Sequence, residues 1–322
     1  MTTVHSRTHL APIGLSVYSR LAHVQKAVRA LQSDPLAAAS ELTVFSDGPA
    51  PGHEAAIRDV REFLRGIAGF RRVNLVFREQ NDRVGNNRGG MRALLRDHGR
   101  MIWVEEDIVV APGFLGFMNA ALDAYEKDTR IFSVCGYRPP FALPPTYEHD
   151  VFALPRFSAW GFATWQDRFD LIRMNISRAE YFRFLLNPAR VLRFARGGAD
   201  LLNMLHSEVH GLIDALDVKI FFQQFNLGMN TLYPTRFLAS NIGHDGTGLH
   251  CVKSSRFDVA LQDSGDYEFA FPGEVEINDD ILKANKRFRD PGLLRKLSFP
   301  ARVARDLFKA PIQRPQVPEE PT

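Results

Sequence analysis

Three consecutive carboxylates, Glu105, Glu106 and Asp107, follow an apolar run in the first half of the chain. Adjacent carboxylates repel one another, and a bound divalent cation removes that repulsion. Oxygen ligands of this kind suit Mg²⁺ or Mn²⁺, which can also bridge the phosphates of a nucleotide diphosphate. An acidic turn that caps the following helix is the other interpretation. The acidic run alone does not separate the two.

The elements that must position these carboxylates alternate between short apolar strands and amphipathic helices. Strands are predicted at 13–17, 42–45, 73–77 and 101–104. The predicted helices between them cover 21–31, 53–68 and 87–96. This alternation predicts an α/β fold with a mainly parallel central sheet flanked by helices. Ligands of such sheets bind beyond the carboxyl ends of the strands, so Asp47, after the second strand, is expected to face the acidic run.

The second half of the chain has a less regular pattern. Residues 137–165 read as an aromatic-rich loop region, and helices are predicted within 178–205 and over 212–225. A short strand at 231–233 precedes a turn-rich segment at 241–250, in which Asn241 and Gly246 are expected to shape the loop.

Five segments occur in one order along the chain: Phe45-Ser-Asp-Gly-Pro49, Arg78-Glu-Gln-Asn81, and residues 103–112, 154–165 and 241–250. Together they resemble the family-two-like glycosyltransferases of the GT-A fold. More distantly, they are similar to the Golgi N-acetylglucosaminyltransferases that begin complex N-glycans. The resemblance implies a GT-A catalytic domain at 10–255, with a nucleotide-binding half at 10–125 and an acceptor and catalytic half at 126–255. Composition predicts a basic helical extension at 256–310 and a proline-rich, disordered tail at 311–322.

The resemblance also implies roles for residues of the first half. Asp107 matches an aspartate that binds the metal, and Glu105 matches a position near the donor sugar. Glu106 stands where relatives have a shorter aspartate that reaches the donor ribose. Asp47 matches an aspartate that faces the nucleobase, where a carboxylate can accept the N3 hydrogen of uracil. Arg20 resembles a basic residue that touches the nucleotide.

Inverting sugar transfer needs a base that takes the proton of the acceptor hydroxyl. Asp214 and Asp217 are the candidates, and the resemblance aligns Asp217 with the base; exposed helix positions are the alternative for both. Trp160 and Gly161 lie in an aromatic segment that suits contact with a sugar, whereas the neighbouring aromatic residues are expected in the core. His250 resembles a histidine that completes the phosphate or metal shell.

The expected function is therefore metal-dependent transfer of a hexosyl or N-acetylhexosaminyl group from a UDP-linked sugar in polysaccharide biosynthesis. The acceptor would be a saccharide or a lipid-linked molecule. A nucleotidyltransferase is the first alternative, and Tyr18-Ser-Arg20 offers no glycine-rich loop with a lysine for a triphosphate. A non-catalytic nucleotide-sugar-binding module is the second, and the retained acidic run and candidate base argue against it.

Composition narrows the partners and the compartment. Among 322 residues, 40 basic and 37 acidic side chains leave a net charge of +3, without the excess typical of nucleic-acid-binding proteins. Cys135 and Cys251 are the only cysteines, which predicts reduced thiols in a cytoplasmic protein. Residues 1–9 lack the apolar core of a signal peptide, and no apolar run is long enough to span a bilayer.

The region 283–309 carries nine lysines and arginines interleaved with apolar residues, predicted as short helices broken at Pro300. Two interpretations stay open. The segment either binds the inner face of a membrane peripherally or packs on the catalytic domain with its charges in water.

Overall fold

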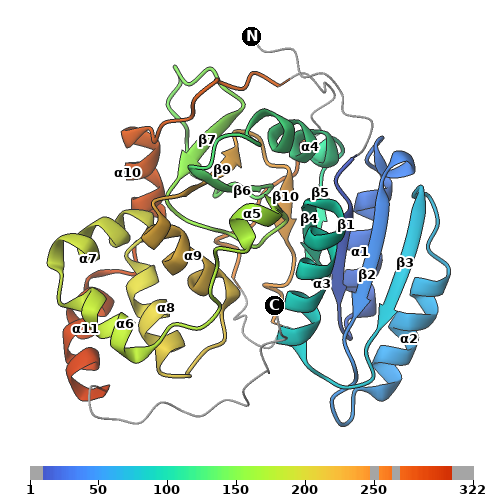
Figure 1. The fold of residues 1–322 in the computed structure, drawn as a ribbon, viewed down its shortest axis with the longest axis horizontal. Coiled ribbons are helices and arrows are strands. Elements are labelled where there is room, and N and C mark those ends of the chain that lie inside the picture. Colours follow the sequence, from blue (N-terminus) through green and yellow to red (C-terminus); the bar gives the residue numbers. More distant parts are fainter. Residues whose placement is uncertain (1–9, 247–253, 263–268, 307–322) are drawn as a thin grey trace.

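The computed structural model describes residues 10–246, 254–262 and 269–306. An eight-stranded sheet forms its centre, with strand order β3-β2-β1-β4-β8-β6-β9-β7 (Figure 1). The strands are β1 (Ile13–Val17), β2 (Glu41–Ser46), β3 (Arg72–Phe77), β4 (Arg100–Glu105), β6 (Ile131–Cys135), β7 (Val151–Leu154), β8 (Phe162–Trp165) and β9 (Asn230–Pro234). Only β8 and β7 run against the other six. The predicted α/β fold with a mainly parallel sheet is confirmed.

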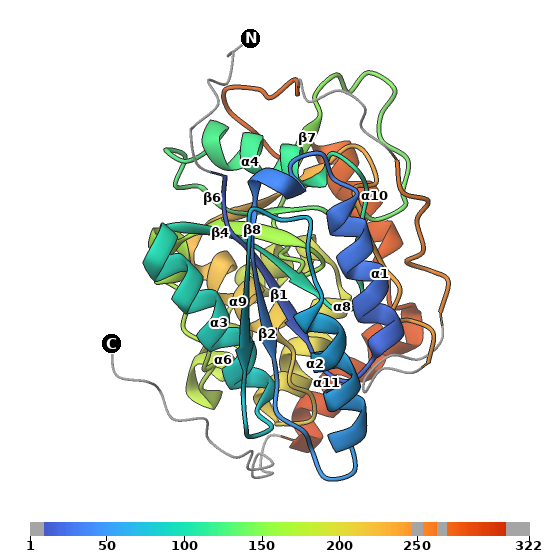
Figure 2. The same cartoon turned by 90° about the vertical axis from the view of Figure 1, so that its right-hand side faces the viewer.

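Helices cover both faces of the first half of the sheet, as Figure 2 shows. Helices α1 (Leu21–Gln32) and α2 (Glu54–Arg65) pack on one face, and α3 (Arg83–His98) packs on the other. Successive residues of a strand point to opposite faces. Val104 therefore joins the core under α1 and α2, whereas Trp103 joins the core with α3. Burial on both faces explains why β1, β2 and β4 are mostly apolar, whereas the edge strand β3 is partly exposed.

The second half of the chain adds a layer of helices beside the sheet and a small second sheet. Helix α4 (Phe114–Ala124) leads into β6, and β10 (Ala239–Asn241) pairs antiparallel with β5 (Ile108–Val110). The remaining helices are α5 (Gln166–Phe169), α6 (Arg178–Leu185), α7 (Pro188–Phe194), α8 (Asp200–Val209), α9 (Leu216–Leu227), α10 (Asp279–Phe288) and α11 (Leu293–Asp306), with short 3₁₀ turns η1 (Ala37–Ala39) and η2 (Ala195–Gly197). None of the helices in the described part of the chain is long and apolar enough to cross a membrane.

The structure corrects three sequence predictions. The helix predicted over 212–225 begins at Leu216, because the carboxylate of Asp214 is held outside it by Arg83 and Lys219. The aromatic region 137–165 contains strands β7 and β8, whose aromatic residues are buried as expected for a core. Pro300 lies inside one continuous helix, α11; its ring is on the exposed side, so it meets no neighbouring element.

Candidate functional site

The carboxyl ends of β1, β2 and β4 meet at one edge of the sheet. Ser16 of β1 pairs with Glu105 of β4. Tyr18, which directly follows β1, donates its backbone N–H to Oε2 of Glu106 at 2.5 Å. Asp47, directly after β2, donates its backbone N–H to the carbonyl of Val17 at 3.2 Å. Asp47 and the acidic run thus lie at the same edge, as the parallel arrangement predicts.

Arg20 binds two of the three carboxylates. Its Nε lies 2.6 Å from Oε1 of Glu106, and its Nη2 lies 2.9 Å from Oδ2 of Asp107. Burial lowers the pKa of Arg20, but these two ion pairs outweigh it and raise the pKa above its ordinary value. Within the described chain, Nη1 of Arg20 and Oδ1 of Asp107 are buried and have no hydrogen-bond partner. One donor and one acceptor are therefore left for a ligand, because buried polar atoms are normally paired.

Glu106 lies between the ends of β1 and β4, and its contact with a donor ribose stays a prediction. Both of its oxygens are used within the protein, by Tyr18 and Arg20, and only 7% of the residue is exposed. Burial raises the pKa of its carboxyl, and the hydrogen bonds from Arg20 and Tyr18 oppose that effect. The structure thus shows Glu106 joining the ends of β1 and β4, and the longer glutamate side chain explains how it reaches both partners.

Asp47 ties two loops of the nucleotide-binding half together. Its Oδ1 accepts hydrogen bonds from the backbone N–H groups of Gly48 and Asp82, and its Oδ2 accepts one from Nδ2 of Asn81 at 3.0 Å. The segments 45–49 and 78–81, noted separately in the sequence, are thereby held in contact. Burial raises the pKa of Asp47, and its contact with a nucleobase stays a prediction.

Glu105 is the carboxylate of the run that faces the second half of the molecule. Its Oε1 lies 3.4 Å from Nδ2 of Asn87, on α3. Burial, together with the negative charges of Asp107 and Asp217, raises the pKa of Glu105 to about 8. The negative charge of Asp217, in the first turn of α9, thus acts on Glu105, although 112 residues separate the two in sequence.

Asp217 lies in the first turn of α9 within a buried group of charges. Burial raises the pKa of its carboxyl, while the charges of Arg156 and Arg289 and a hydrogen bond from the backbone of Ala159 lower it. Arg156 forms a two-pronged ion pair with Asp200, with both N–O distances 2.9 Å. The two arginines therefore oppose the effect of burial without cancelling it, and the pKa of Asp217 stays above its ordinary value.

Arg289 enters this group from the end of α10, far along the chain. A Cβ built on Gly198 would lie 2.4 Å from Oδ1 of Asp200, 2.6 Å from Nη1 of Arg156 and 3.1 Å from Cβ of Arg289, which shows how closely the three side chains approach. Burial and the charge of Arg156 lower the pKa of Arg289 to about 10, so it stays protonated at neutral pH. Its Nε is buried and lacks a partner among the described residues.

The carboxylate of Asp214, the other candidate base, forms ion pairs with two basic side chains. Its Oδ1 lies 2.5 Å from Nζ of Lys219, and its Oδ2 lies 2.8 Å from Nη2 of Arg83. These three residues line a small cleft between the beginnings of α3 and α9, with Asn87 and Leu216 among its other walls. Asn87, one of the residues that line the cleft, also contacts Glu105.

Trp160 and Gly161 differ in what the structure shows of them. Trp160 is half-buried, and its ring centroid lies 4.6 Å from that of Tyr137, 5.3 Å from His244 and 5.5 Å from Phe257. Gly161 has a φ of +67°, which favours glycine, and a Cβ there would lie 3.3 Å from the ring of Phe114. A sugar contact through Trp160 stays a prediction.

The loop after β10 lies directly against Asp107. The backbone N–H of Ile242 donates to the carbonyl of Asp107 at 2.8 Å, and Oδ1 of Asn241 accepts from the N–H of Gly243 at 2.7 Å. A Cβ on Gly243 would lie 2.3 Å from Oδ2 of Asp107, so only glycine permits this approach. Asn241 thus shapes the loop as expected, and His250 lies outside the described residues.

A divalent cation fits this site only in part through the described residues. No group of three histidine, cysteine, aspartate or glutamate side chains among them is arranged to hold a metal ion. Asp107 offers one buried, unpartnered oxygen, and Arg20 takes the other. This arrangement suits a cation that takes one protein oxygen here and its other ligands from phosphate oxygens and water, as Mg²⁺ commonly does.

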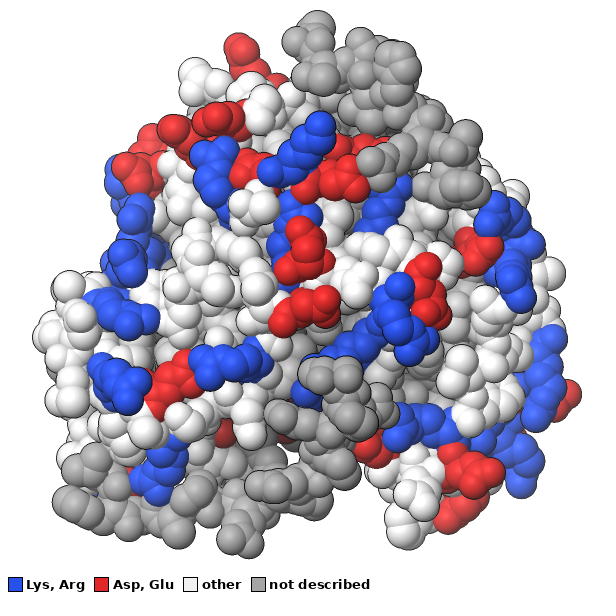
Figure 3. Space-filling view, viewed as in Figure 1, with Lys and Arg blue, Asp and Glu red and all other residues white. Residues whose placement is uncertain are grey.

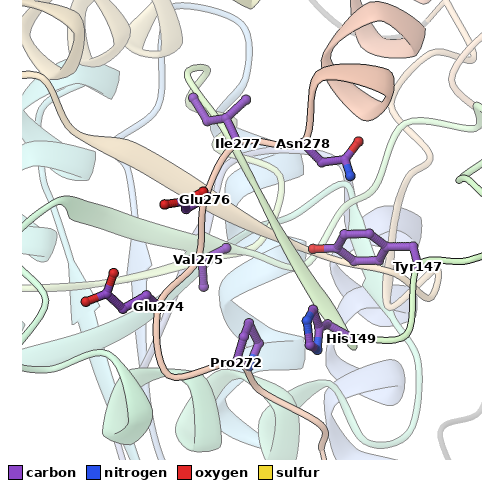
Figure 4. A pocket seen from close by; sticks show the side chains of 8 residues that line it. All are labelled: Tyr147, His149, Pro272, Glu274, Val275, Glu276, Ile277 and Asn278. Carbon is purple, nitrogen blue, oxygen red and sulfur yellow. The ribbon is translucent and has the colours of Figure 1, made fainter.

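The described residues also carry surface charges and a pocket away from the strand ends. On the face in Figure 3, basic and acidic side chains are interspersed, which agrees with the small net charge. A separate open pocket of about 400 Å³ lies between the loop before β7 and the segment before α10 (Figure 4). It is lined by Tyr147, His149, Pro272, Glu274, Val275, Glu276, Ile277 and Asn278, none of which the sequence singled out.

Sequence reasoning missed four residues of the site: Tyr18, Asn87, Arg156 and Arg289. Asn86 and Asn87 are consecutive amides at the beginning of a predicted helix, which is a weak signal, and their burial is known only from the structure. The two arginines carried none. Their carboxylate partners lie tens of residues away, and no local pattern marks a basic residue as buried.

In comparisons with known proteins, this chain is similar to several solved structures. No protein-family model matches the chain, and no curated protein matches it. The mannosyltransferase PcManGT from Pyrobaculum calidifontis, in complex with GDP-Man and Mn²⁺, is 15% identical over 50% of this chain and 46% of that one, with a TM-score of 0.32. GalNAc-T7 with UDP, GalNAc and Mn²⁺ is 11% identical over 70% of this chain and 42% of that one, with a TM-score of 0.44.

The galactosyltransferase LgtC, in complex with donor and acceptor sugar analogues, is 10% identical over 69% of this chain and 72% of that one, with a TM-score of 0.37. The chain spans less than half the length of the first two solved proteins.

Proposed function

We propose that this chain transfers a sugar from a nucleotide-diphosphate sugar to an acceptor hydroxyl with the help of a divalent cation. The observation that carries the proposal is the ion pair of Arg20 with Asp107 at the strand ends, in which each residue has one buried atom without a partner among the described residues. A free donor and a free carboxylate oxygen at one point suit a phosphate oxygen and its cation.

Asp107 is the protein ligand of the cation in this proposal, and His250 would join it from the segment beyond the loop 241–246. The cation would be Mn²⁺ or Mg²⁺, and when bound it supplies positive charge to the departing diphosphate. Arg20 adds a second positive charge through its free Nη1, which can donate to a phosphate oxygen. Glu106 holds Arg20 in place for this role.

Asp217 is the proposed base of an inverting transfer. The acceptor oxygen attacks the anomeric carbon as its proton passes to Asp217, and the bond from that carbon to the diphosphate breaks, so that the nucleoside diphosphate leaves with the electron pair. The reaction needs Asp217 ionised before it begins. Arg156 and Arg289 oppose the rise in pKa that burial causes at Asp217, and both oxygens of Asp214 already bind basic side chains, so we favour Asp217 as the base.

Donor recognition would involve both halves of the chain. Asp47, whose carboxylate also binds Gly48, Asn81 and Asp82, would face uracil of a UDP-sugar, and Glu105 and Trp160 would lie near a hexosyl or N-acetylhexosaminyl group. Gly161 fixes the backbone beside Trp160. The acceptor would be a saccharide or a lipid-linked molecule, as in polysaccharide biosynthesis on the cytoplasmic side of a membrane.

A ligand screen followed by a product assay tests the proposal. Binding to the native state raises the transition temperature, so UDP-sugars, GDP-sugars and the free nucleotides, with and without Mn²⁺, can be ranked by thermal shift. The donor that gives the largest shift with Mn²⁺ is then incubated with saccharide acceptors, and the products are identified by mass spectrometry. Binding of a nucleoside triphosphate with release of pyrophosphate would indicate a nucleotidyltransferase. Donor binding without product would indicate a binding module.

A further inference from the structure

Helix α11 is held on the molecule by one side only. Arg302 donates to Oδ1 of Asn203 at 2.9 Å and to the hydroxyl of Ser207 at 3.2 Å, both on α8. At the end of α11, Oδ2 of Asp306 lies 3.2 Å from Nε2 of the buried His206. These contacts fix the orientation of the helix, so the residues on its opposite side must face outward.

The outward side of α11 is apolar. Leu293, Leu294 and Leu297 are 69%, 85% and 65% exposed, and they form the first turn and a half of the helix. Ala301 and Ala304 continue the same stripe at helical spacing and are also exposed. Three exposed leucines within five residues differ from the singly scattered apolar residues of an ordinary protein surface.

Basic residues accompany this stripe. The helix contains Arg295, Lys296, Arg302 and Arg305 against the single acidic residue Asp306. Lys296 and Arg305 are exposed and form ion pairs with Asp290 and Asp306, and Lys286 and Arg287 are exposed on α10. An apolar stripe bordered by cations complements a surface that has apolar chains beneath anionic headgroups. A second copy of this chain would bring the same cations together and repel.

We propose that the outward side of α11 binds the surface of an anionic lipid bilayer, with Leu293, Leu294 and Leu297 inserted between the headgroups. Figure 1 shows α11 at the edge of the helical layer beside α6 and α8, where a flat surface can reach it. The packing of Arg302 and Asp306 stays intact in this arrangement. In combination with the proposed sugar transfer, such binding would bring the enzyme to lipid-linked acceptors, but lipid binding itself does not depend on that activity.

Vesicle co-sedimentation of the full-length protein tests the proposal. We expect binding to vesicles of phosphatidylcholine with phosphatidylglycerol, weaker binding to phosphatidylcholine alone, and a decrease as the salt concentration rises. The variant with Leu293→Ser, Leu294→Ser and Leu297→Ser should bind the anionic vesicles more weakly than the wild type by a factor of at least about ten. Its melting temperature should match that of the wild type, because the three side chains contact water in the free protein.

A matched control removes three exposed leucines elsewhere: Leu171→Ser, Leu212→Ser and Leu227→Ser, at positions 49%, 52% and 42% exposed. This control should bind vesicles as the wild type does. The proposal is overturned if the wild-type protein ignores anionic vesicles at low salt, or if both triple variants bind equally. It is also overturned if light scattering shows a wild-type dimer that the α11 variant dissociates, because the leucines would then cover a second copy. Donor binding, measured by thermal shift without lipid, should be the same in all three proteins, so failure here is distinct from failure of the proposed sugar transfer.

Discussion

Nη2 of Arg20 lies 2.9 Å from Oδ2 of Asp107, and on each side of this ion pair one buried atom, Nη1 or Oδ1, has no partner within the described chain. An ion pair that served only stability would be expected to satisfy its buried atoms, because an unpartnered buried polar group is costly. The two open atoms lie at the carboxyl ends of the strands, where ligands of such sheets bind.

Asp107→Asn should lower the rate of sugar transfer by about 10²-fold or more, because the amide keeps an oxygen but loses the charge that holds a cation. The fold should be unchanged by circular dichroism. Asp59→Asn, at an exposed aspartate of α2, serves as the control and should leave the rate unaltered. Chelation with EDTA should inactivate the wild type; full turnover in both the variant and the chelated enzyme would contradict the metal role of Asp107.

Asp217→Asn should slow transfer by about 10²-fold, the typical effect of losing a positioned base, with little change in donor binding by thermal shift. The product of the wild type should show inverted anomeric configuration by NMR. Asp214→Asn is the matched comparison and should remain active, since its carboxylate already binds Lys219 and Arg83. Retained configuration would remove Asp217 from this role.

The stability of Asp217→Asn should respond to pH in a defined direction. Burial raises the folded-state pKa of Asp217 above its unfolded value, so the folded protein binds the proton more tightly. The contribution of Asp217 to the stability of the wild type is therefore fully present below the unfolded-state pKa, and it is lost as the pH rises through the folded-state pKa. Asparagine does not titrate at this position, so the melting temperature of the variant should rise relative to that of the wild type as the pH increases from acidic to neutral. A constant difference would show that the pKa of Asp217 is not raised.

Arg289→Gln should shift the acidic limb of the pH–rate profile to higher pH. The charge of Arg289 lowers the pKa of Asp217, so its removal raises that pKa and leaves less of the base ionised at a given pH. Arg287→Gln removes an exposed arginine two residues away and is the control. An equal loss of rate at all pH values would point to a purely structural role for Arg289.

Gly161→Ala should destabilise the fold by about 1–2 kcal/mol, measured by urea unfolding. Alanine must adopt a φ of +67° there, and its methyl group would press on the ring of Phe114. Gly273→Ala, where an added Cβ meets nothing within 4 Å, should stay within about 0.5 kcal/mol of the wild type.

Local patterns were enough to predict the parallel half of the sheet. The four strands and three helices of that half occur at the predicted places, since each strand is an apolar run between amphipathic helices. The same logic placed Asp47 and the acidic run at one edge. Ends of elements were less predictable, as at α9, where ion pairs of Asp214 rather than local propensity decide the first helical residue.

The charges around Asp217 could not be predicted from the sequence. Arg156 comes from the turn after β7 and Arg289 from the end of α10, and their meeting depends on how the helices pack on the sheet. Glu106 illustrates a different limit. Its place in the acidic run was evident, but the inward turn of its side chain toward Tyr18 and Arg20 depends on a contact across strands.

Arg289 and Leu293 are four residues apart, at the end of α10 and the beginning of α11. A chain shortened before residue 289 would thus lose a charge next to Asp217 together with the leucines of α11. Deletion mapping of this region would merge two separate effects into one phenotype. Point substitutions separate the two effects. Because Arg289 and Leu293 are only four residues apart, a shift of α11 would also move the charge of Arg289 relative to Asp217.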